Sequence, residues 1–473
     1  MTTECNQTSF EFHALLQRKI IAKFDGGDIT SDAGILVLRE VEKRAGIIAG
    51  LAECFTDYRD PEAIEHTVRE LLAQRIYGLC LGYEDLNDHD QLRLDPMLAV
   101  AVEKADPLGE NRHKVSDRGK ALAGKSTLNR LELTKADASR QERYKKIAMD
   151  GEEIDRWIVE VFIGSHASVP EEIVLDLDAT DDLIHGNQEG RFYHGYYGNY
   201  CYLPLYIFSG EHLLCARLRR SNIDGADGTV EELKRIVGQI RGAWPEVRIV
   251  LRADSGFCRD ELMSWCEEED NRIDYVMGLA KNVRLTKEIA DEMKRAEAQF
   301  KETGKPARVF KDFRYQTRES WTRERRVVGK AEFMEKGANP RFVVTSLAPE
   351  RMAARSLYED FYCARGDMEN RIKEQQLDMF ADRTSAATMR ANQLRLYLSS
   401  VAYMLMHALR RMGLKDTDLE RAQCQTIRLK LLKIGAQIRV TVRNIWISLA
   451  GGYPYAEAFA AVLRNLQAFP LLC

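Results

Sequence analysis

A nearly continuous apolar run ends in a carboxylate in the stretch Val247-Arg248-Ile249-Val250-Leu251-Arg252-Ala253-Asp254. Its length and its aliphatic, β-branched residues are typical of a buried strand. A second run of this kind, Ile173-Val174-Leu175-Asp176-Leu177-Asp178, also ends in an aspartate. Ligands collect at the carboxyl ends of strands in open α/β sheets. The two runs therefore predict two strands whose last residues belong to a functional site.

The segments around these strands predict a mixed sheet that is covered by helices. Further strands are expected over 200–208, 212–218 and 275–279, and helices are expected from Thr229 and over 259–269. Two or three antiparallel strands followed by alternating helices and strands give an α/β fold with a mixed sheet. This order of elements fits an RNase H-like, retroviral-integrase-like core.

The length of 473 residues is enough for about three domains. The patterns predict a mainly helical region over residues 1–150 and a core whose two parts are residues 151–283 and 349–400. A β-rich insertion, residues 284–348, separates the two parts of the core, and a basic helical region follows over residues 401–473.

Composition narrows the class of protein. No apolar run reaches the 18 or so residues of a membrane span, and Met1–Phe10 lacks the basic and apolar parts of a secretory signal, so we expect a cytoplasmic protein without a membrane partner. Ten cysteines are scattered without a C-x₂-C pair, which favours free thiols over zinc or disulfides.

The net charge of −4 does not itself suggest nucleic acid, but residues 383–473 carry 13 Lys/Arg against four Asp/Glu. That segment predicts either a phosphate-binding surface or a solvated helical face.

A third carboxylate, Glu369, lies in a segment with helical spacing. Leu357, Phe361, Ala364, Met368 and Ile372 form its packing face, and Tyr362, Arg365, Glu369, Lys373 and Gln376 form a polar stripe beside it. Asp178, Asp254 and Glu369 together suit two Mg²⁺ ions, because the metal prefers a few hard oxygen ligands. Two such ions clamp the attacking and leaving oxygens of a phosphodiester.

Each of these residues also has a purely structural interpretation. Strand-end aspartates such as Asp176 and Asp178 often cap turns or form salt bridges, and Asp254 can cap the helix that follows it. Glu369 can belong to a surface ladder of opposite charges.

The same residues resemble the motifs of bacterial DDE insertion-sequence transposases. Tyr362-x₂-Arg365-x₃-Glu369 is similar to the start of their tyrosine-arginine-glutamate-lysine signature, and Leu177–Thr180 and Leu251–Phe257 are similar to their two aspartate motifs. Four more segments resemble one branch, insertion-sequence family thirteen-eighty: Phe24–Asp28, Gly82–Asp90, Thr127–Glu132 and Arg428–Gly435. The resemblance thus covers most of the chain.

The resemblance implies roles for particular residues. Asp178, Asp254 and Glu369 would bind two Mg²⁺ ions, for which Mn²⁺ can substitute. Tyr362, Arg365 and Lys373 would contact DNA. The family lysine lies seven residues after the glutamate, where this chain has Gln376, so Lys373 is expected to replace it one turn earlier.

Two further segments are candidates for binding phosphates or bases. Gly119-x₄-Gly124-Lys125-Ser126 matches a P-loop formally, but the segment before it is polar rather than a buried strand, so no nucleotide cofactor is expected. Lys125 and Arg130 are instead expected near DNA. Trp321 lies among arginines that include Arg323, and we expect it either to stack an unpaired base or to pack in the core.

The resemblance implies an insertion-sequence transposase that cleaves transposon ends and joins the 3′-OH to target DNA without ATP. Its expected partners are the terminal inverted repeats, target DNA in the bacterial nucleoid and a second copy of the chain. The 1–150 region and the basic C-terminal region would bind the repeats. The alternatives are a DNA-binding repressor or domesticated scaffold on the same fold, and an ATP-dependent enzyme built on residues 119–126.

Overall fold

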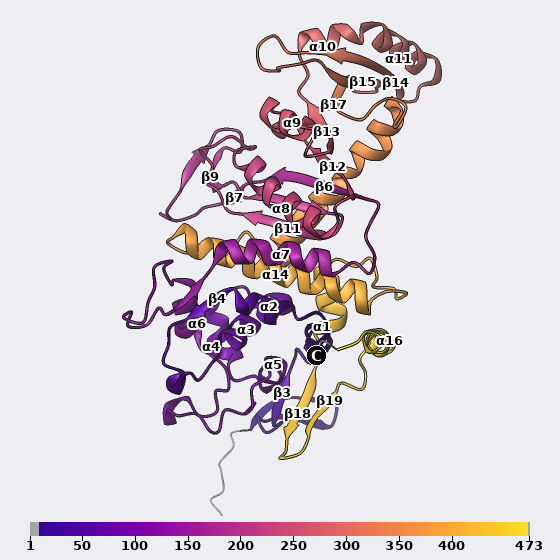
Figure 1. The fold of residues 1–473 in the computed structure, drawn as a ribbon. Helices are drawn as coiled ribbons and strands as arrows, with labels where there is room; N and C mark the ends of the chain where they lie inside the picture. Colours follow the sequence, from indigo (N-terminus) through magenta and orange to yellow (C-terminus); the bar gives the residue numbers. More distant parts are fainter. Residues whose placement is uncertain (1–8, 472–473) are drawn as a thin grey trace, which may run out of the picture. The chain divides into compact units, whose positions relative to one another are not determined.

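The computed structural model describes residues 9–471 and divides the chain into two compact units. One unit comprises Met1–Met149 with Val401–Cys473, and the other comprises Asp150–Ser400. Residues 1–8 of the segment expected to lack a secretory signal lie outside the described residues. The fold is mixed α/β, as the sequence predicts (Figure 1).

A nine-stranded mixed sheet forms the centre of the unit Asp150–Ser400. Its order is β11-β10-β6-β12-β13-β17-β15-β14, with the short β16 beside β15. The neighbours β6, β12 and β13 are parallel, whereas β10 and β17 pair antiparallel to β6 and β13. The strands are β6 Glu172–Ala179, β10 Leu205–Ser209, β11 His212–Arg217, β12 Arg248–Ala253, β13 Ile273–Leu279, β14 Ala307–Tyr315, β15 Arg325–Met334, β16 Gly337–Ala338 and β17 Arg341–Thr345.

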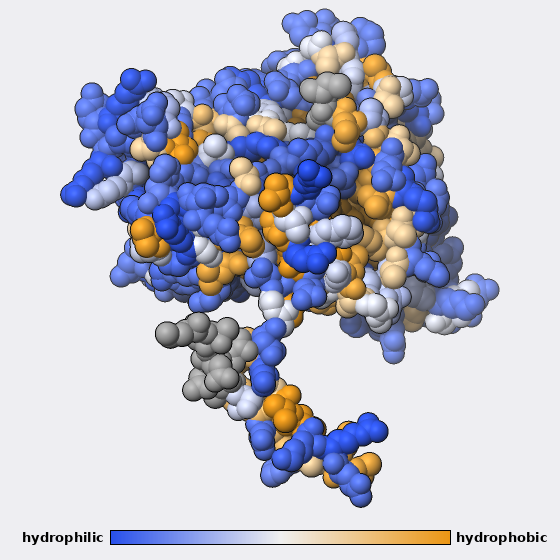
Figure 2. Space-filling view, turned by 90° about the horizontal axis from the view of Figure 1, so that it is seen from below, coloured by the Kyte–Doolittle hydropathy of each residue, from blue (hydrophilic) through white to orange (hydrophobic). Residues whose placement is uncertain are grey.

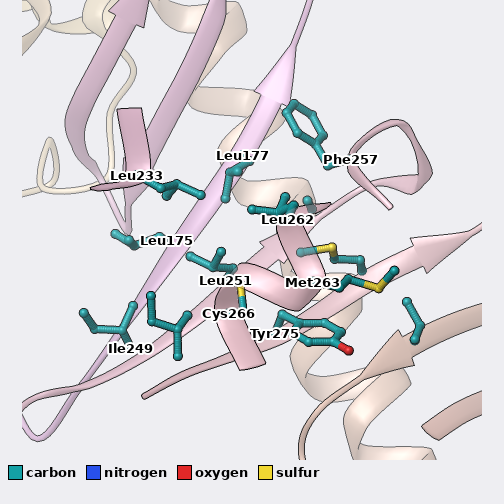
Figure 3. Packing of buried hydrophobic residues seen from close by; sticks show 14 of the residues in the cluster. Leu175, Leu177, Leu233, Ile249, Leu251, Phe257, Leu262, Met263, Cys266 and Tyr275 are labelled. Atoms are coloured by element: carbon teal, nitrogen blue, oxygen red, sulfur yellow. The ribbon is translucent and has the colours of Figure 1, made fainter. Parts of the chain in front are cut away.

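Alternation along the central strands gives this sheet two apolar faces. On one face Leu175 and Leu177 of β6 and Leu251 of β12 pack against Leu233 of α8 and Leu262 of α9 (Figure 3). The opposite face has its own cluster, which includes Val250 and Val276 of the strands and Leu357 of the segment that follows the sheet. Since successive side chains point to opposite faces of a strand, β12 and β13 contribute to both clusters, with Leu251 and Tyr275 on one face and Val250 and Val276 on the other. The helices of the unit are α7 Gly151–Gly164, α8 Thr229–Ala243, α9 Asp260–Glu267, α10 Val283–Glu288, α11 Ala290–Thr303, α12 Ala354–Ser356, α13 Gly366–Lys373 and α14 Met389–Gly413, which continues into the other unit.

The expected β-rich insertion, residues 284–348, extends the central sheet. Val343 and Val344 of β17 pair with Gly278 and Met277 of β13, and β15 and β14 follow outward. Without β17, the edge of β13 would present unpaired backbone groups, and a further strand satisfies them most directly. A small separate sheet, β7 Asp182–Leu183, β8 Phe192–His194 and β9 Asn199–Tyr202, completes the strands of this unit.

The unit made of the two chain ends is mostly helical but contains strands that the sequence analysis did not expect. The expected helical region 401–473 includes a hairpin of β18 Ala436–Val440 and β19 Ile445–Leu449, which pairs with β3 Asp28–Thr30. The expectation that residues 401–473 are helical is therefore corrected for this hairpin. Ile438 and Val440 alternate with polar residues, and an alternation with a period of two is typical of a strand. The remaining elements are β1 Phe10–Leu15, β2 Arg18–Ala22, α1 Ile35–Ala45, α2 Ile47–Glu53, β4 Phe55–Asp57, α3 Val68–Leu81, α4 His89–Leu92, α5 Pro96–Ala101, α6 Lys125–Glu132, β5 Ile147–Met149, α15 Cys424–Ile427 and α16 Ala456–Gln467, with short 3₁₀ turns at Pro61–Ala63, Leu86–Asp88 and Val115–Asp117 and a π-helical turn at Arg428–Leu432.

Within residues 9–471, every helix is too short or too polar to cross a lipid bilayer. On the face of the molecule that Figure 2 shows, hydrophilic residues predominate.

Candidate active site

Asp178 and Asp254 are neighbours on adjacent parallel strands. The register pairs Arg252 with Asp176 and Ala253 with Leu177, so the next residues along both strands are the two aspartates. Leu177 and Ala253 lie in the cluster on the α8–α9 face. Because side chains alternate, Asp178 and Asp254 belong to the opposite face, where the segment with Glu369 packs.

A buried ion pair joins the two strands two residues before the aspartates. Arg252 donates from Nε and Nη2 to the carboxylate of Asp176, over 2.5 and 2.8 Å, and from Nη1 to the carbonyl oxygen of Phe361 over 2.6 Å. Burial raises the pKa of Asp176, and the Arg252 guanidinium opposes that rise. The pair therefore ties the strand ends to the residue that precedes Tyr362.

The Glu369 segment is helical but irregular. After α12 it passes through a π-helical turn at Leu357–Tyr362, a 3₁₀ turn at Cys363–Arg365, α13 and a second π-helical turn at Glu374–Asp378. Leu357, Met368 and Ile372 of the expected packing face are buried. Such π turns are frequent at functional sites, and each changes the direction in which the following side chains point.

Arg365 lies between two of the three carboxylates. Its guanidinium is 2.5 Å from the carboxylate of Glu369 and 3.8 Å from that of Asp178. The contact with Glu369 is the pair with four-residue spacing that the alternative interpretation of a charge ladder requires. The additional contact with Asp178 links the helix to the end of β6.

The charges of Asp254 and Glu369 both act on the carboxyl group of Asp178. The pKa of Asp178 is raised to about 6, chiefly by burial and also by the charges of Asp254 and Glu369, while the Arg365 guanidinium opposes the rise. A nearby cation would stabilise the ionised form of Asp178, because the positive charge offsets both the cost of desolvation and the repulsion from the other two carboxylates.

Asp254 uses one carboxylate oxygen as a cap. Its Oδ1 accepts a hydrogen bond of 2.8 Å from the backbone N–H of Gly256, at the start of the 3₁₀ turn Ser255–Phe257. The capping role of the alternative interpretation is thus present. The hydrogen bond to Gly256 holds the Asp254 carboxylate at the end of β12, next to the end of the strand that carries Asp178.

The donor set fits a hard divalent cation by its chemistry. The converging groups are carboxylates, which Mg²⁺ and Mn²⁺ prefer, and a guanidinium already supplies positive charge between Asp178 and Glu369. Among the described residues, no three His, Cys, Asp or Glu side chains are yet grouped closely enough to hold a metal ion. Metal binding by all three residues therefore requires their carboxylates to come closer together than they are here.

Gly278 makes room for Tyr362 beside Asp254. A Cβ atom on Gly278 would lie 2.6 Å from the Tyr362 hydroxyl oxygen and 2.9 Å from the Ser255 backbone nitrogen. Neither position tolerates such an approach, so the Gly278→Ala variant must displace the tyrosine or the end of β12.

We expect Gly278→Ala to lower the free energy of unfolding by about 1–3 kcal/mol, the usual cost of overpacking. Thermal unfolding measures this change. Gly242→Ala in α8 is the matched control, because no atom lies within 4 Å of its new Cβ. Equal stability of Gly278→Ala and wild type would show that Tyr362 does not pack as described.

The remaining residues of the polar stripe lie at the edge of this site. Lys373 is exposed, and the side-chain amide of Gln376 donates to the carbonyl oxygen of Asp181 over 3.3 Å. Gln376 therefore contacts the loop that follows β6, three residues after Asp178.

Asp182, the first residue of β7, is a buried acid with a strongly raised pKa. It is 2% exposed, its Oδ2 accepts a hydrogen bond of 2.7 Å from Thr384, and its Oδ1 has no partner within residues 9–471. Burial raises its pKa to about 7, the Thr384 hydrogen bond opposes the rise, and Asp382 and Asp181 add to it.

The shift predicts a pH-dependent stability. Between about pH 4 and pH 7 the folded protein holds a proton on Asp182 that the unfolded chain releases, so this group's contribution to stability falls as the pH rises. Asp182→Asn cannot titrate. We therefore expect its free energy of unfolding, relative to wild type, to increase from pH 4 to pH 7 and then to level off in denaturant titrations. A difference that does not change with pH would contradict the shift.

Trp321 does not have the exposure that base stacking requires. Its side chain is 6% exposed in the large apolar cluster, its ring meets Tyr315 edge-on at 5.8 Å, and the Arg325 guanidinium lies 5.4 Å from the ring centroid. Of the two roles expected for Trp321, base stacking and core packing, the structure therefore has core packing. Arg323 is largely exposed and forms an ion pair of 3.5 Å with Glu267.

Lys125 and Arg130 lie on α6, in the other unit. Asp90 accepts a hydrogen bond of 3.1 Å from the Lys125 backbone N–H, and the segment before Gly119 is the 3₁₀ turn Val115–Asp117 rather than a strand. The P-loop geometry is therefore absent from this part of the described chain. Arg130 is exposed, with its guanidinium 4.6 Å from the ring centroid of Tyr144.

Two comparisons give similarities to known proteins. The chain is similar to the piggyBac transposase in a cryo-EM structure of its synaptic complex with hairpin DNA, at 12% sequence identity and a TM-score of 0.38, over 85% of this chain and 80% of that one. No curated protein matches. The profile of the family described as transposase DDE domain group 1 matches residues 12–471, which is nearly the whole sequence. The chain therefore belongs to the transposases of DDE domain group 1.

Proposed function

We propose that this transposase cleaves the ends of an insertion sequence and transfers the exposed 3′-OH into target DNA. The observation that supports the proposal is that Asp178 and Asp254 follow paired residues of two adjacent strands, while Arg365 contacts both Asp178 and Glu369. We assign the central strands and the Glu369 segment to an RNase H-like core. Within the family, we place the chain in insertion-sequence family thirteen-eighty on the motifs quoted above.

Asp178, Asp254 and Glu369 would hold two Mg²⁺ ions, or Mn²⁺ in their place. Metals bound there would lower the pKa of a water molecule and stabilise the charge on the phosphodiester oxygens. Asp254 is positioned for this role by the Gly256 N–H, and Asp178 by the end of β6.

Arg365 would exchange partners when DNA binds. In the free protein it neutralises Glu369 and Asp178. With cations on the carboxylates, the guanidinium would turn to a DNA phosphate, for which its planar set of donors is suited. Tyr362, held over Gly278, would position the strand, and Lys373 would contact an adjacent phosphate.

The chemistry consists of two substitutions at phosphorus. Water attacks the phosphodiester at a transposon end, the P–O3′ bond breaks, and the leaving oxygen becomes a 3′-OH on the transposon strand. That hydroxyl then attacks a target phosphodiester and displaces a target 3′-oxygen, so one bond forms as one breaks and no ATP is needed. Joining two ends at one target requires two active sites, and we propose a homodimer on the inverted repeats.

The test uses labelled duplexes that carry the element's own ends. We expect wild type to release a transposon strand with a 3′-OH in Mg²⁺ or Mn²⁺ and to release none in EDTA. A pre-cleaved end should join target DNA when it has a 3′-OH and should fail when it ends in a 3′-deoxynucleotide. Binding of the ends without cleavage in either metal would favour the repressor or scaffold alternative.

A further inference from the structure

The unit of the two chain ends contains a basic cavity that the proposed chemistry does not use. Its volume is about 380 Å³, and its basic lining residues are Arg59, Arg93, Arg112, Lys114, Lys120, Arg130 and Lys146. Among the described residues, three acids line it, namely Glu65, Asp90 and Asp117. We call this cavity the basic pocket.

Most of the positive charge in the basic pocket is not neutralised by the acids. Arg112 pairs with Glu65, Arg59 pairs with Asp57 outside the lining, and Lys125 pairs with Asp90. By contrast, the ammonium groups of Lys120 and Lys146 donate to backbone carbonyl oxygens, each over 2.7 Å. Neutral carbonyls leave the charge of those two lysines uncompensated, which favours an anionic ligand.

His66 forms a buried part of the wall. It is 6% exposed, and its ring makes no hydrogen bond to any residue between 9 and 471. Burial first, and then the charges of Lys104, Arg112 and Arg59, together lower its pKa to about 3, so the ring is neutral at neutral pH. A neutral imidazole keeps one N–H donor. An oxygen of a ligand in the basic pocket can accept a hydrogen bond from it.

The sequence around the basic pocket indicates an extended anion. Residues 112–146 contain 11 Lys/Arg against four Asp/Glu, within a protein whose net charge is −4. At the pocket, the exposed ring of Tyr144 has the guanidinium groups of Arg130 and Arg143 at 4.6 and 4.8 Å from its centroid. A basic surface that continues beyond one cavity matches a polymer of phosphates better than a single phosphate.

We infer that the basic pocket binds a backbone phosphate of DNA, with Lys120, Lys146 and the N–H of His66 as its donors. The inference rests on the proposed function in taking DNA as the ligand. It adds a phosphate site far along the sequence from the carboxylates and gives the 1–150 region a defined point of contact.

The test is fluorescence anisotropy of a labelled duplex with the full-length protein at several NaCl concentrations. Removing one lysine that binds a phosphate lowers the salt slope of the affinity by about one. We expect Lys120→Gln/Lys146→Gln to lower the slope by about two and to weaken binding about tenfold or more at low salt. The control, Lys294→Gln/Lys301→Gln, removes two lysines from the exposed surface of α11 and should leave both values unchanged.

His66→Phe separates hydrogen bonding from charge. Because the ring is neutral, we expect weaker binding with an unchanged slope. Unchanged slope and affinity in Lys120→Gln/Lys146→Gln, while thermal unfolding shows an intact fold, would overturn the inference.

Inorganic pyrophosphate distinguishes a free anion from DNA. If pyrophosphate at constant ionic strength stabilises wild type but not Lys120→Gln/Lys146→Gln, while both bind DNA equally, the pocket takes a small anion and the assignment to DNA is wrong. These measurements need no cleavage. Failure of wild type to cleave its ends would therefore count against the proposed function alone.

Discussion

Cleavage of transposon-end DNA is expected to fall about a thousandfold or more in each of Asp178→Asn, Asp254→Asn and Glu369→Gln. Each substitution keeps the shape of the side chain but removes a negative charge that would hold a metal ion. A thousandfold reduction corresponds to about 4 kcal/mol of transition-state stabilisation, which is within the range of one metal contact. Single-turnover cleavage, with the protein in excess over the end DNA, measures the effect.

Asp367→Asn is the matched control for the carboxylate variants. Asp367 lies two residues from Glu369 on α13 and is exposed, so the substitution removes a charge from the same helix without touching the converging group. We expect normal cleavage in this control and normal end binding in all four variants. Cleavage near the wild-type rate in any one of the three carboxylate variants would remove that residue from the site.

The second large effect concerns stability. Arg252→Met should lower the free energy of unfolding by about 3–5 kcal/mol, because it leaves the carboxylate of Asp176, 2% exposed, buried without its partner. For a unit the size of Asp150–Ser400 this corresponds to a fall in Tm of roughly 10 °C. Differential scanning calorimetry measures it.

The same two strands offer a control pair on the surface. Arg248 and Glu172 are 3.7 Å apart, and Arg248 is largely exposed, so Arg248→Met should cost less than about 1 kcal/mol. The double variant Asp176→Leu/Arg252→Met should recover much of the stability that Arg252→Met forfeits, since two apolar side chains can replace a buried ion pair. Arg252→Met as stable as Arg248→Met would show that the buried pair is not needed for the fold.

The strand pattern of the core was predictable because it depends on local alternation. The apolar runs that end at Asp178 and Asp254 form β6 and β12, and the alternation of β12 gives apolar residues to both faces of the sheet. The expectation of a DDE transposase is confirmed by the family match. Neither the strand pattern nor the family motifs depend on contacts between residues far apart in the sequence.

The parts that were not predicted depend on such contacts. No local pattern indicates that β17 adds to β13, so the strands of residues 284–348 were expected as an insertion rather than as part of the sheet. Likewise, the expectation for Trp321 rested on its arginine neighbours in sequence, whereas Tyr315 and the apolar cluster determine its burial. The role of Arg252 follows only from the register that places it beside Asp176.

The most direct test of the central claim is Mn²⁺ binding, measured by electron paramagnetic resonance on the protein bound to uncleaved end DNA. We predict two Mn²⁺ ions per wild-type chain, the same number in Asp367→Asn and none bound tightly in Asp178→Asn/Asp254→Asn. Equal Mn²⁺ binding by the double variant and wild type would contradict the account, because the metal would then be held elsewhere.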